Sequence, residues 1–105
     1  MIQIENKEQL EEVIKNNDVV LMDFYADWCG PCKVLLPVVE KVSGEMDGVA
    51  FCKINVDQCG DLAKEYGVRS IPALKLMKSG ENIATTLGAK TADKLVSWIN
   101  EELGN

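Results

Sequence analysis

The sequence has 105 residues, of which 47% are hydrophobic and 27% are charged, as expected for one folded domain covering residues 1–105. Its net charge of −6, with only eleven scattered basic residues, disfavours nucleic-acid binding, because phosphate recognition needs clustered Lys and Arg. No apolar run approaches the roughly 18 residues that span a bilayer, so no membrane association is expected. The first residues lack the pattern of a secretory signal, and we therefore expect a cytoplasmic protein.

Apolar periodicity and capping residues predict the first elements of the chain. Ile2–Ile4 has the pattern of a short edge strand, and Asn6 is placed to cap a helix over Lys7–Asn16. The run Val19–Tyr25 is almost entirely apolar, which is typical of a strand covered on both faces. We therefore expect a central parallel strand there. Asp23 is the one charged residue in this apolar run.

A long amphipathic helix is predicted to follow this strand. It is expected to begin at Pro31, because proline fits the first turn of a helix. Pro37 lies inside the helix, where a kink is expected. Ser43 and Gly44 weaken its last turns, and Gly48 is expected to end it.

The second half of the chain is predicted to contain three more strands and two more helices. The strands are Val49–Val56, Ala73–Lys78 and Asn82–Leu87, and the helices are Gly60–Tyr66 and a last helix capped by Thr91. Strands and helices alternate until the last two strands, which follow each other directly. The expected fold class is therefore α/β, with a mixed central β-sheet that combines a parallel part and an antiparallel hairpin, flanked by helices on both faces.

Cys29 and Cys32 have two residues between them and lie at a junction between a strand and a helix. In a reducing compartment, such a pair is more often redox-active or metal-binding than a structural disulfide. The other two cysteines, Cys52 and Cys59, have six residues between them, and the chain contains no histidine, so a zinc site is disfavoured. We expect Cys52 to be a core residue and Cys59 to be exposed, with a regulatory role for Cys59 left open.

Helical spacing predicts different environments for the two thiols of the pair. Cys29 precedes the apolar stripe of the helix and is expected to be accessible, whereas Cys32 lies one turn before Leu35 and is expected to be buried. The free N–H groups and the partial positive charge of a helix N-terminus favour a thiolate at Cys29. Cys29 is therefore expected to attack a disulfide, and Cys32 to resolve the mixed disulfide that results.

Asp23 lies in the apolar strand six residues before Cys29. Burial raises the pKa of a carboxylate, so Asp23 is a candidate to accept the proton that Cys32 loses when it attacks. The alternative is a structural carboxylate that a lysine or the backbone satisfies.

Together these residues resemble the thioredoxin family along nearly the whole chain. The resemblance rests on the run Asp23–Lys33, with its Trp-Cys-Gly-Pro-Cys-Lys motif, followed by Pro37, Lys53–Asp57, Tyr66–Pro72, Gly80 and Gly88. It implies the thioredoxin fold and a thiol-disulfide oxidoreductase that reduces protein disulfides. It also implies that no cofactor or metal is bound, because the Cys29–Cys32 pair itself shuttles between dithiol and disulfide.

The same resemblance implies further residues at the site. Asp23 would be the buried acid and Lys53 its neighbour, and Trp28 would pack beside the cysteines. The other supporting residues are those of the motif, Gly30, Pro31 and Lys33.

A substrate-binding surface is also implied, made of Trp28, Ile71, Pro72 and Gly88. From the residues alone we expect a trans bond before Pro72, because a cis X-Pro bond costs about 0.5–1 kcal/mol. The resemblance implies instead a cis bond, with the Ile71 backbone pairing with an extended substrate segment.

The implied partners are a thioredoxin reductase, which would supply electrons, and disulfide-containing proteins, which would receive them. We expect the protein to be a monomer. Two other functions remain open, an oxidase or isomerase of the same fold and a binding subunit without catalysis. The Gly-Pro pair between the cysteines argues against the first, and the presence of both Cys29 and Cys32 argues against the second.

Overall fold

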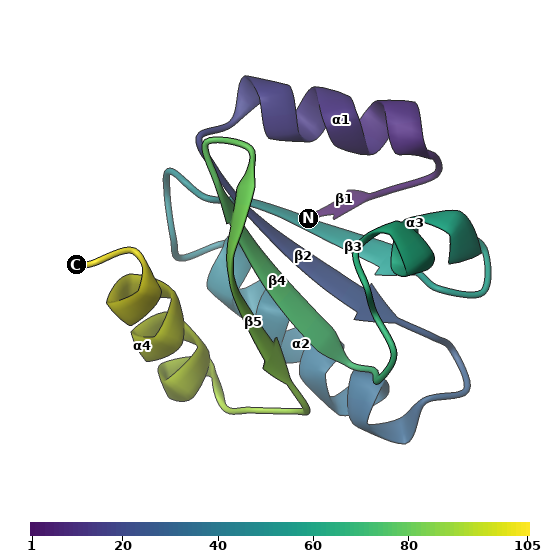
Figure 1. Cartoon of the computed structure of the whole chain (residues 1–105). Helices are drawn as coiled ribbons and strands as arrows, with labels where there is room; N and C mark the ends of the chain where they lie inside the picture. Colours follow the sequence, from purple (N-terminus) through teal and green to yellow (C-terminus); the bar gives the residue numbers. More distant parts are fainter.

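The computed structural model describes residues 1–105 and contains five strands and four helices in the predicted order (Figure 1). No helix combines the length and the apolar character that crossing a membrane requires. The elements are β1 (Ile2–Gln3), α1 (Lys7–Asn16), β2 (Val19–Tyr25), α2 (Gly30–Ser43), β3 (Ala50–Asn55), α3 (Gly60–Glu65), β4 (Ala73–Lys78), β5 (Glu81–Leu87) and α4 (Ala92–Glu102).

The strands form one mixed sheet in the order β1-β3-β2-β4-β5. β2 lies at its centre, and all seven of its residues are buried, as its apolar run predicted. It is parallel to β3 but antiparallel to β4, so the expected parallel environment holds on one side only. The direction of β4 follows from where it starts, because Ala73 lies opposite Phe24 near the end of β2.

Alternation along β2 divides the core into two layers, visible as the helices on either side of the sheet in Figure 1. Val20, Met22 and Phe24 pack into the layer that α1 and α3 cover. Val19 and Leu21 pack into the layer that α2 and α4 cover. Each large apolar side chain buried in this way contributes roughly 1.5–3 kcal/mol, which fixes the position of β2 between the layers.

α2 ends at Ser43, so the prediction that it continues toward Gly48 is wrong. The Gly44 N–H donates to the carbonyls of Glu40 and Lys41, at 3.3 and 3.1 Å, which tightens the last turn. The Ser43 hydroxyl also donates to the Glu40 carbonyl, at 2.6 Å. The Ser43 hydroxyl and the Gly44 N–H thus share the Glu40 carbonyl, and α2 ends at this Ser-Gly pair.

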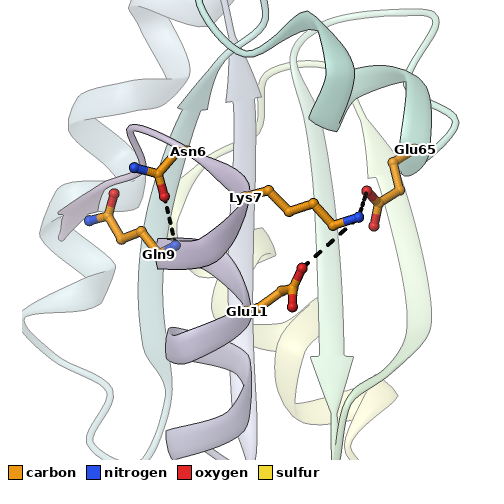
Figure 2. Close-up of polar contacts among 5 residues, drawn as sticks. All are labelled: Asn6, Lys7, Gln9, Glu11 and Glu65. Atoms are coloured by element: carbon orange, nitrogen blue, oxygen red, sulfur yellow. Dashed lines mark hydrogen bonds and ion pairs between the residues drawn. The ribbon is translucent and has the colours of Figure 1, made fainter.

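The N-terminus of α1 is capped as the sequence predicted (Figure 2). The Asn6 side chain accepts a hydrogen bond from the Gln9 N–H at 2.8 Å. The Gln9 side chain in turn accepts from the Glu5 N–H and donates to the Gln3 carbonyl, at 2.6 and 3.0 Å. These bonds satisfy N–H groups that the first turn of a helix leaves free and join α1 to β1.

Lys7 connects α1 to α3 on the surface (Figure 2). Its ammonium lies 3.1 Å from the carboxylate of Glu65 and 4.0 Å from that of Glu11. All three side chains are largely exposed, so water and salt screen these pairs. We therefore assign the stability of this corner to the buried core beneath it rather than to the ion pairs.

Removing the cap of α1 tests this account of its start. Asn6→Ala should lower the free energy of unfolding by about 1 kcal/mol, because the Gln9 N–H loses its acceptor. Urea denaturation measures the change, with Lys15→Ala on the exposed side of the same helix as the control. Equal effects of the two substitutions would contradict the capping role.

Candidate functional site

β2 leads through a short turn into α2, and the two cysteines lie at this junction. The Cys29 N–H donates to the Ala26 carbonyl at 3.3 Å, which closes the turn. Cys29 is the N-cap of α2, and its Sγ accepts from the Cys32 N–H at 3.3 Å. The two residues form a disulfide, with their Cα atoms 5.2 Å apart. The disulfide therefore lies at the carboxyl edge of β2, where open α/β sheets carry their sites.

Both cysteines are buried, which corrects the expectation that Cys29 is accessible. Cys29 is 5% exposed and Cys32 is 2% exposed, so only the predicted burial of Cys32 is confirmed. Cys29 packs with Tyr25 and Ala26, and Ile71 lies against this cluster. Helical spacing predicts the position of Cys29 at the start of α2. It does not predict that the loop before β4, which includes Ile71, covers Cys29.

That loop forms the second wall of the site. The Ile71–Pro72 peptide bond is cis, as the resemblance implied and the residues alone did not. Cys29 Sγ lies 3.9 Å from the Ile71 carbonyl oxygen, and the Pro72 carbonyl accepts from the Gly88 N–H at 3.0 Å. Gly88 has φ +86°, a conformation that favours glycine. The disulfide, the proline loop and the end of β5 are thus directly connected.

Trp28 lies on the open side of the site and is 70% exposed. Its indole N–H donates to a carboxylate oxygen of Asp57 at 2.9 Å, which ties the ring to the loop after β3. The Asn55 side chain fixes the Asp57 loop by accepting from the N–H groups of Asp57 and Gln58, at 2.9 and 3.3 Å. Sequence reasoning did not assign a role at the site to Asn55 or Asp57. The signal was present, because both end or follow a buried strand at the same edge of the sheet.

Asp23 is a buried carboxylate without a partner. It is 1% exposed, and neither of its oxygens has a hydrogen-bond partner. Lys53 is its neighbour on β3, but the Lys53 ammonium pairs with Glu40 instead, at 3.9 Å. Burial raises the pKa of Asp23 to about 7, an effect that the charge of Lys53 opposes only in part. The alternative of a carboxylate satisfied by lysine or by backbone is therefore not what the structure contains.

Asp23 lies on the same side of the sheet as the disulfide. Strand alternation places it between Leu21, which packs in the layer of α2, and Tyr25, which packs with Cys32. It is the one buried acidic residue of the chain. A group that can gain or lose a proton near neutral pH thus lies on the side of the sheet that carries α2 and the disulfide.

The rest of the motif lies on the exposed side of that first turn, at Gly30, Pro31 and Lys33. A hollow of about 210 Å³ lies against the turn, and its lining residues are Tyr25, Ala26, Asp27, Cys32, Lys33 and Leu36. This volume is large enough for water molecules beside Cys32.

The other two cysteines lie on the opposite side of the sheet, in the layer of α1 and α3. Cys52 is fully buried as predicted, and burial raises the pKa of its thiol to about 12. The expectation that Cys59 is exposed is wrong, because it is 3% exposed and its Sγ lies 3.8 and 3.6 Å from the carbonyls of Ile4 and Glu5. No group of three or more His, Cys, Asp or Glu is arranged to hold a metal ion.

Comparison with known proteins agrees with this geometry. The thioredoxin family model matches residues 1–101. A thioredoxin from Rickettsia felis is 42% identical over 94 residues, which cover 89% of this chain and 90% of that protein. A thioredoxin from Pyropia yezoensis is 45% identical over 92 residues, which cover 87% of this chain and 86% of that protein.

The fold matches solved thioredoxins equally well. A mutant thioredoxin from Halobacterium salinarum superposes with a TM-score of 0.90 at 42% identity, covering 96% of this chain and 88% of that one. Thioredoxin from Malassezia sympodialis superposes with a TM-score of 0.85 at 38% identity, covering 97% and 90%. Sequence, fold and the Cys29–Cys32 disulfide agree, and the chain belongs to the thioredoxin family of thiol-disulfide oxidoreductases.

Proposed function

We propose that this protein reduces protein disulfides in two exchange steps, with Cys29 as the attacking residue and Cys32 as the resolving residue. The observation that carries the proposal is the position of the Cys29–Cys32 disulfide, at the start of α2 and beside the Ile71 carbonyl. In the reduced protein the same geometry holds two thiols close enough to act on one substrate in sequence.

In the first step, the Cys29 thiolate attacks one sulfur of a substrate disulfide. A new S–S bond joins Cys29 to the substrate, and the second substrate sulfur leaves and takes up a proton. The Cys32 N–H, which donates to Cys29 Sγ at 3.3 Å, stabilises negative charge on that sulfur. The partial positive charge at the start of α2 acts in the same direction, so Cys29 rather than Cys32 is favoured as the thiolate.

In the second step, Cys32 attacks Cys29 Sγ and releases the reduced substrate. The Cys32 thiol must lose its proton for this attack, and its buried surroundings disfavour a free thiolate. Asp23 is the proton acceptor that we assign to this step, because it is the one buried acidic residue and lies on the same side of the sheet as the disulfide. Lys53 modulates Asp23 by lowering its pKa from the value that burial alone would give.

The substrate binds over Trp28, Ile71, Pro72 and Gly88. An extended segment beside Cys29 can pair with the backbone of Ile71, as a strand added at an edge does. The exposed ring of Trp28 supplies apolar contact area on the other side of Cys29. Gly88 has no side chain to obstruct the approach over the proline loop.

Two electrons leave the protein in each cycle, so the Cys29–Cys32 disulfide must be reduced again. We assign this step to a thioredoxin reductase, and place the protein as a monomer in a reducing compartment such as the cytoplasm. Membership of the thioredoxin family supports the choice of reductase.

Trapping tests the order of the two steps. Cys32→Ser should accumulate mixed disulfides between Cys29 and its substrates, because the resolving sulfur is missing. Cys29→Ser should form none and should reduce insulin no faster than dithiothreitol does alone. Mass spectrometry of the trapped species locates the bond, and substrate attached to Cys32 in the Cys29→Ser protein would reverse our assignment.

The pKa of Asp23 predicts how stability depends on pH. The folded state keeps the Asp23 proton up to a pKa of about 7, whereas an unfolded chain releases it at about pH 3.9. Protonation of Asp23 therefore favours the folded state at low pH. The free energy of unfolding falls as pH rises from about 3.9 to about 7, and Asp23 causes no further fall above that range. The free energy of unfolding of Asp23→Asn, relative to that of the wild type, should rise by roughly 3–4 kcal/mol between pH 3.5 and pH 8.

Urea denaturation of the oxidised proteins measures this difference. Asp47→Asn is the matched control, because Asp47 is exposed. Its free energy of unfolding should keep a constant difference from that of the wild type across the same pH range. If the curves of Asp23→Asn and wild type run parallel, Asp23 is ionised in the folded protein and our account of its pKa fails.

Asp23→Asn should also slow the second step by on the order of 10²-fold near neutral pH, because the proton acceptor is lost. Stopped-flow measurement of substrate release from a preformed Cys29 mixed disulfide isolates this step. The wild-type rate should rise with pH through about 7, and the variant should lack that rise. A variant with the wild-type pH profile would show that Asp23 is structural.

A further inference from the structure

A groove lies next to the active site, on the side of α2 and α4. Its volume is about 410 Å³, and its lining residues are Val34, Val38, Ala89, Lys90, Thr91 and Lys94. Val34 is 64% exposed although it is an apolar residue in the first half of α2. The groove therefore has an apolar wall from α2 and two lysines on the opposite wall.

The two lysines have no counterion. No carboxylate lines the groove, and neither Lys90 nor Lys94 takes part in any of the ion pairs of the chain. The Lys90 ammonium is held in place by the carbonyls of Leu87 and Gly88, at 3.4 and 3.1 Å. Burial and the charge of Lys94 both lower the pKa of Lys90, which indicates two neighbouring positive charges in a partly desolvated place. A bound anion would relieve this repulsion.

The groove touches the proposed substrate surface at Gly88, because the Lys90 ammonium lies 3.1 Å from the Gly88 carbonyl oxygen. Gly88 donates to the Pro72 carbonyl, and Ala89 and Lys90 follow it directly in the chain. On the other wall, Val34 lies on the exposed face of α2, away from buried Cys32. The Gly88 end of the groove therefore joins it to the surface over which we propose that the substrate binds.

We propose that this groove binds an acidic segment of the substrate protein, in which an Asp or Glu side chain contacts Lys90 and Lys94 and an adjacent apolar side chain contacts Val34 and Val38. The inference rests on the reductase function proposed above and adds a preference among substrates. The net charge of −6 repels acidic proteins in general, so a local positive site decides which of them can bind.

Two disulfide peptides test the preference. One carries Glu-Leu-Glu at both ends, and the other carries Lys-Leu-Lys at the same positions. The wild-type protein should reduce the Glu peptide with a kcat/KM roughly three- to tenfold higher than that of the Lys peptide. At about 1 M salt, where the Debye length is about 3 Å, the preference should disappear.

Charge reversal locates the effect. Lys90→Glu combined with Lys94→Glu should invert the preference. Lys15→Glu combined with Lys78→Glu makes the same change in net charge at exposed positions away from the groove, and should leave the preference intact. An equal rate for both peptides with the wild type, or an equal loss in both double variants, would overturn the proposal.

Two further measurements separate this inference from the reductase function. The rate with uncharged bis(hydroxyethyl) disulfide reports the exchange chemistry alone and should be the same in the wild type and in both charge-reversed double variants. Binding is measured without chemistry by NMR, using Cys29→Ser/Cys32→Ser protein and peptides whose cysteines are serine. The Glu peptide should shift the amide signals of Val34, Ala89 and Lys94. Shifts confined to other residues, or equal binding of the Lys peptide, would overturn the groove as an acidic-segment site even if reduction proceeds.

Discussion

The site depends on one constraint, which is that Cys29 must end the turn from β2 and cap α2 at the same time. β2 is fixed because all seven of its residues are buried between two layers of helices. The start of α2 is fixed because Cys29 Sγ accepts from the Cys32 N–H. With both ends held, the two sulfurs are placed together at one edge of the sheet. Preorganisation of this kind is what lets two thiols act in sequence on one substrate.

The burial that holds the site together also raises the pKa of Asp23, which is the proton acceptor that we propose. A carboxylate in the middle of β2 opposes folding when it is ionised, because no hydrogen bond or ion pair compensates for its lost hydration. Lys53 lies beside Asp23 in the sheet, yet its ammonium is turned toward Glu40 at the surface. The result is an acid whose pKa lies near neutrality, where it can exchange protons with a thiol. At Asp23, the stability of the fold and the proton transfer that we propose therefore place opposite demands on one carboxyl group.

Local patterns predicted most of the elements, because caps and apolar periods act over a few residues. The Asn6 cap, the bounds of α1 and the buried run of β2 were all visible in the sequence. The burial of Cys29 was not visible, because it depends on Ile71, which is 42 residues away in the chain. Cys59 was misjudged for the same reason, since the carbonyls of Ile4 and Glu5 that lie against its sulfur come from the N-terminus. Helical spacing and composition hold no information on contacts at such separations.

Cys29 and Cys32 are both buried in the disulfide form, yet we propose that they have different roles. Brief alkylation of the fully reduced protein with iodoacetamide at pH 7, followed by digestion and mass spectrometry, distinguishes the two thiols. Our account predicts a label on Cys29 well before Cys32, with Cys52 and Cys59 unlabelled while the protein is folded, because burial raises the pKa of both of these thiols. Labelling of Cys32 first, or of both active-site sulfurs at one rate, would contradict it.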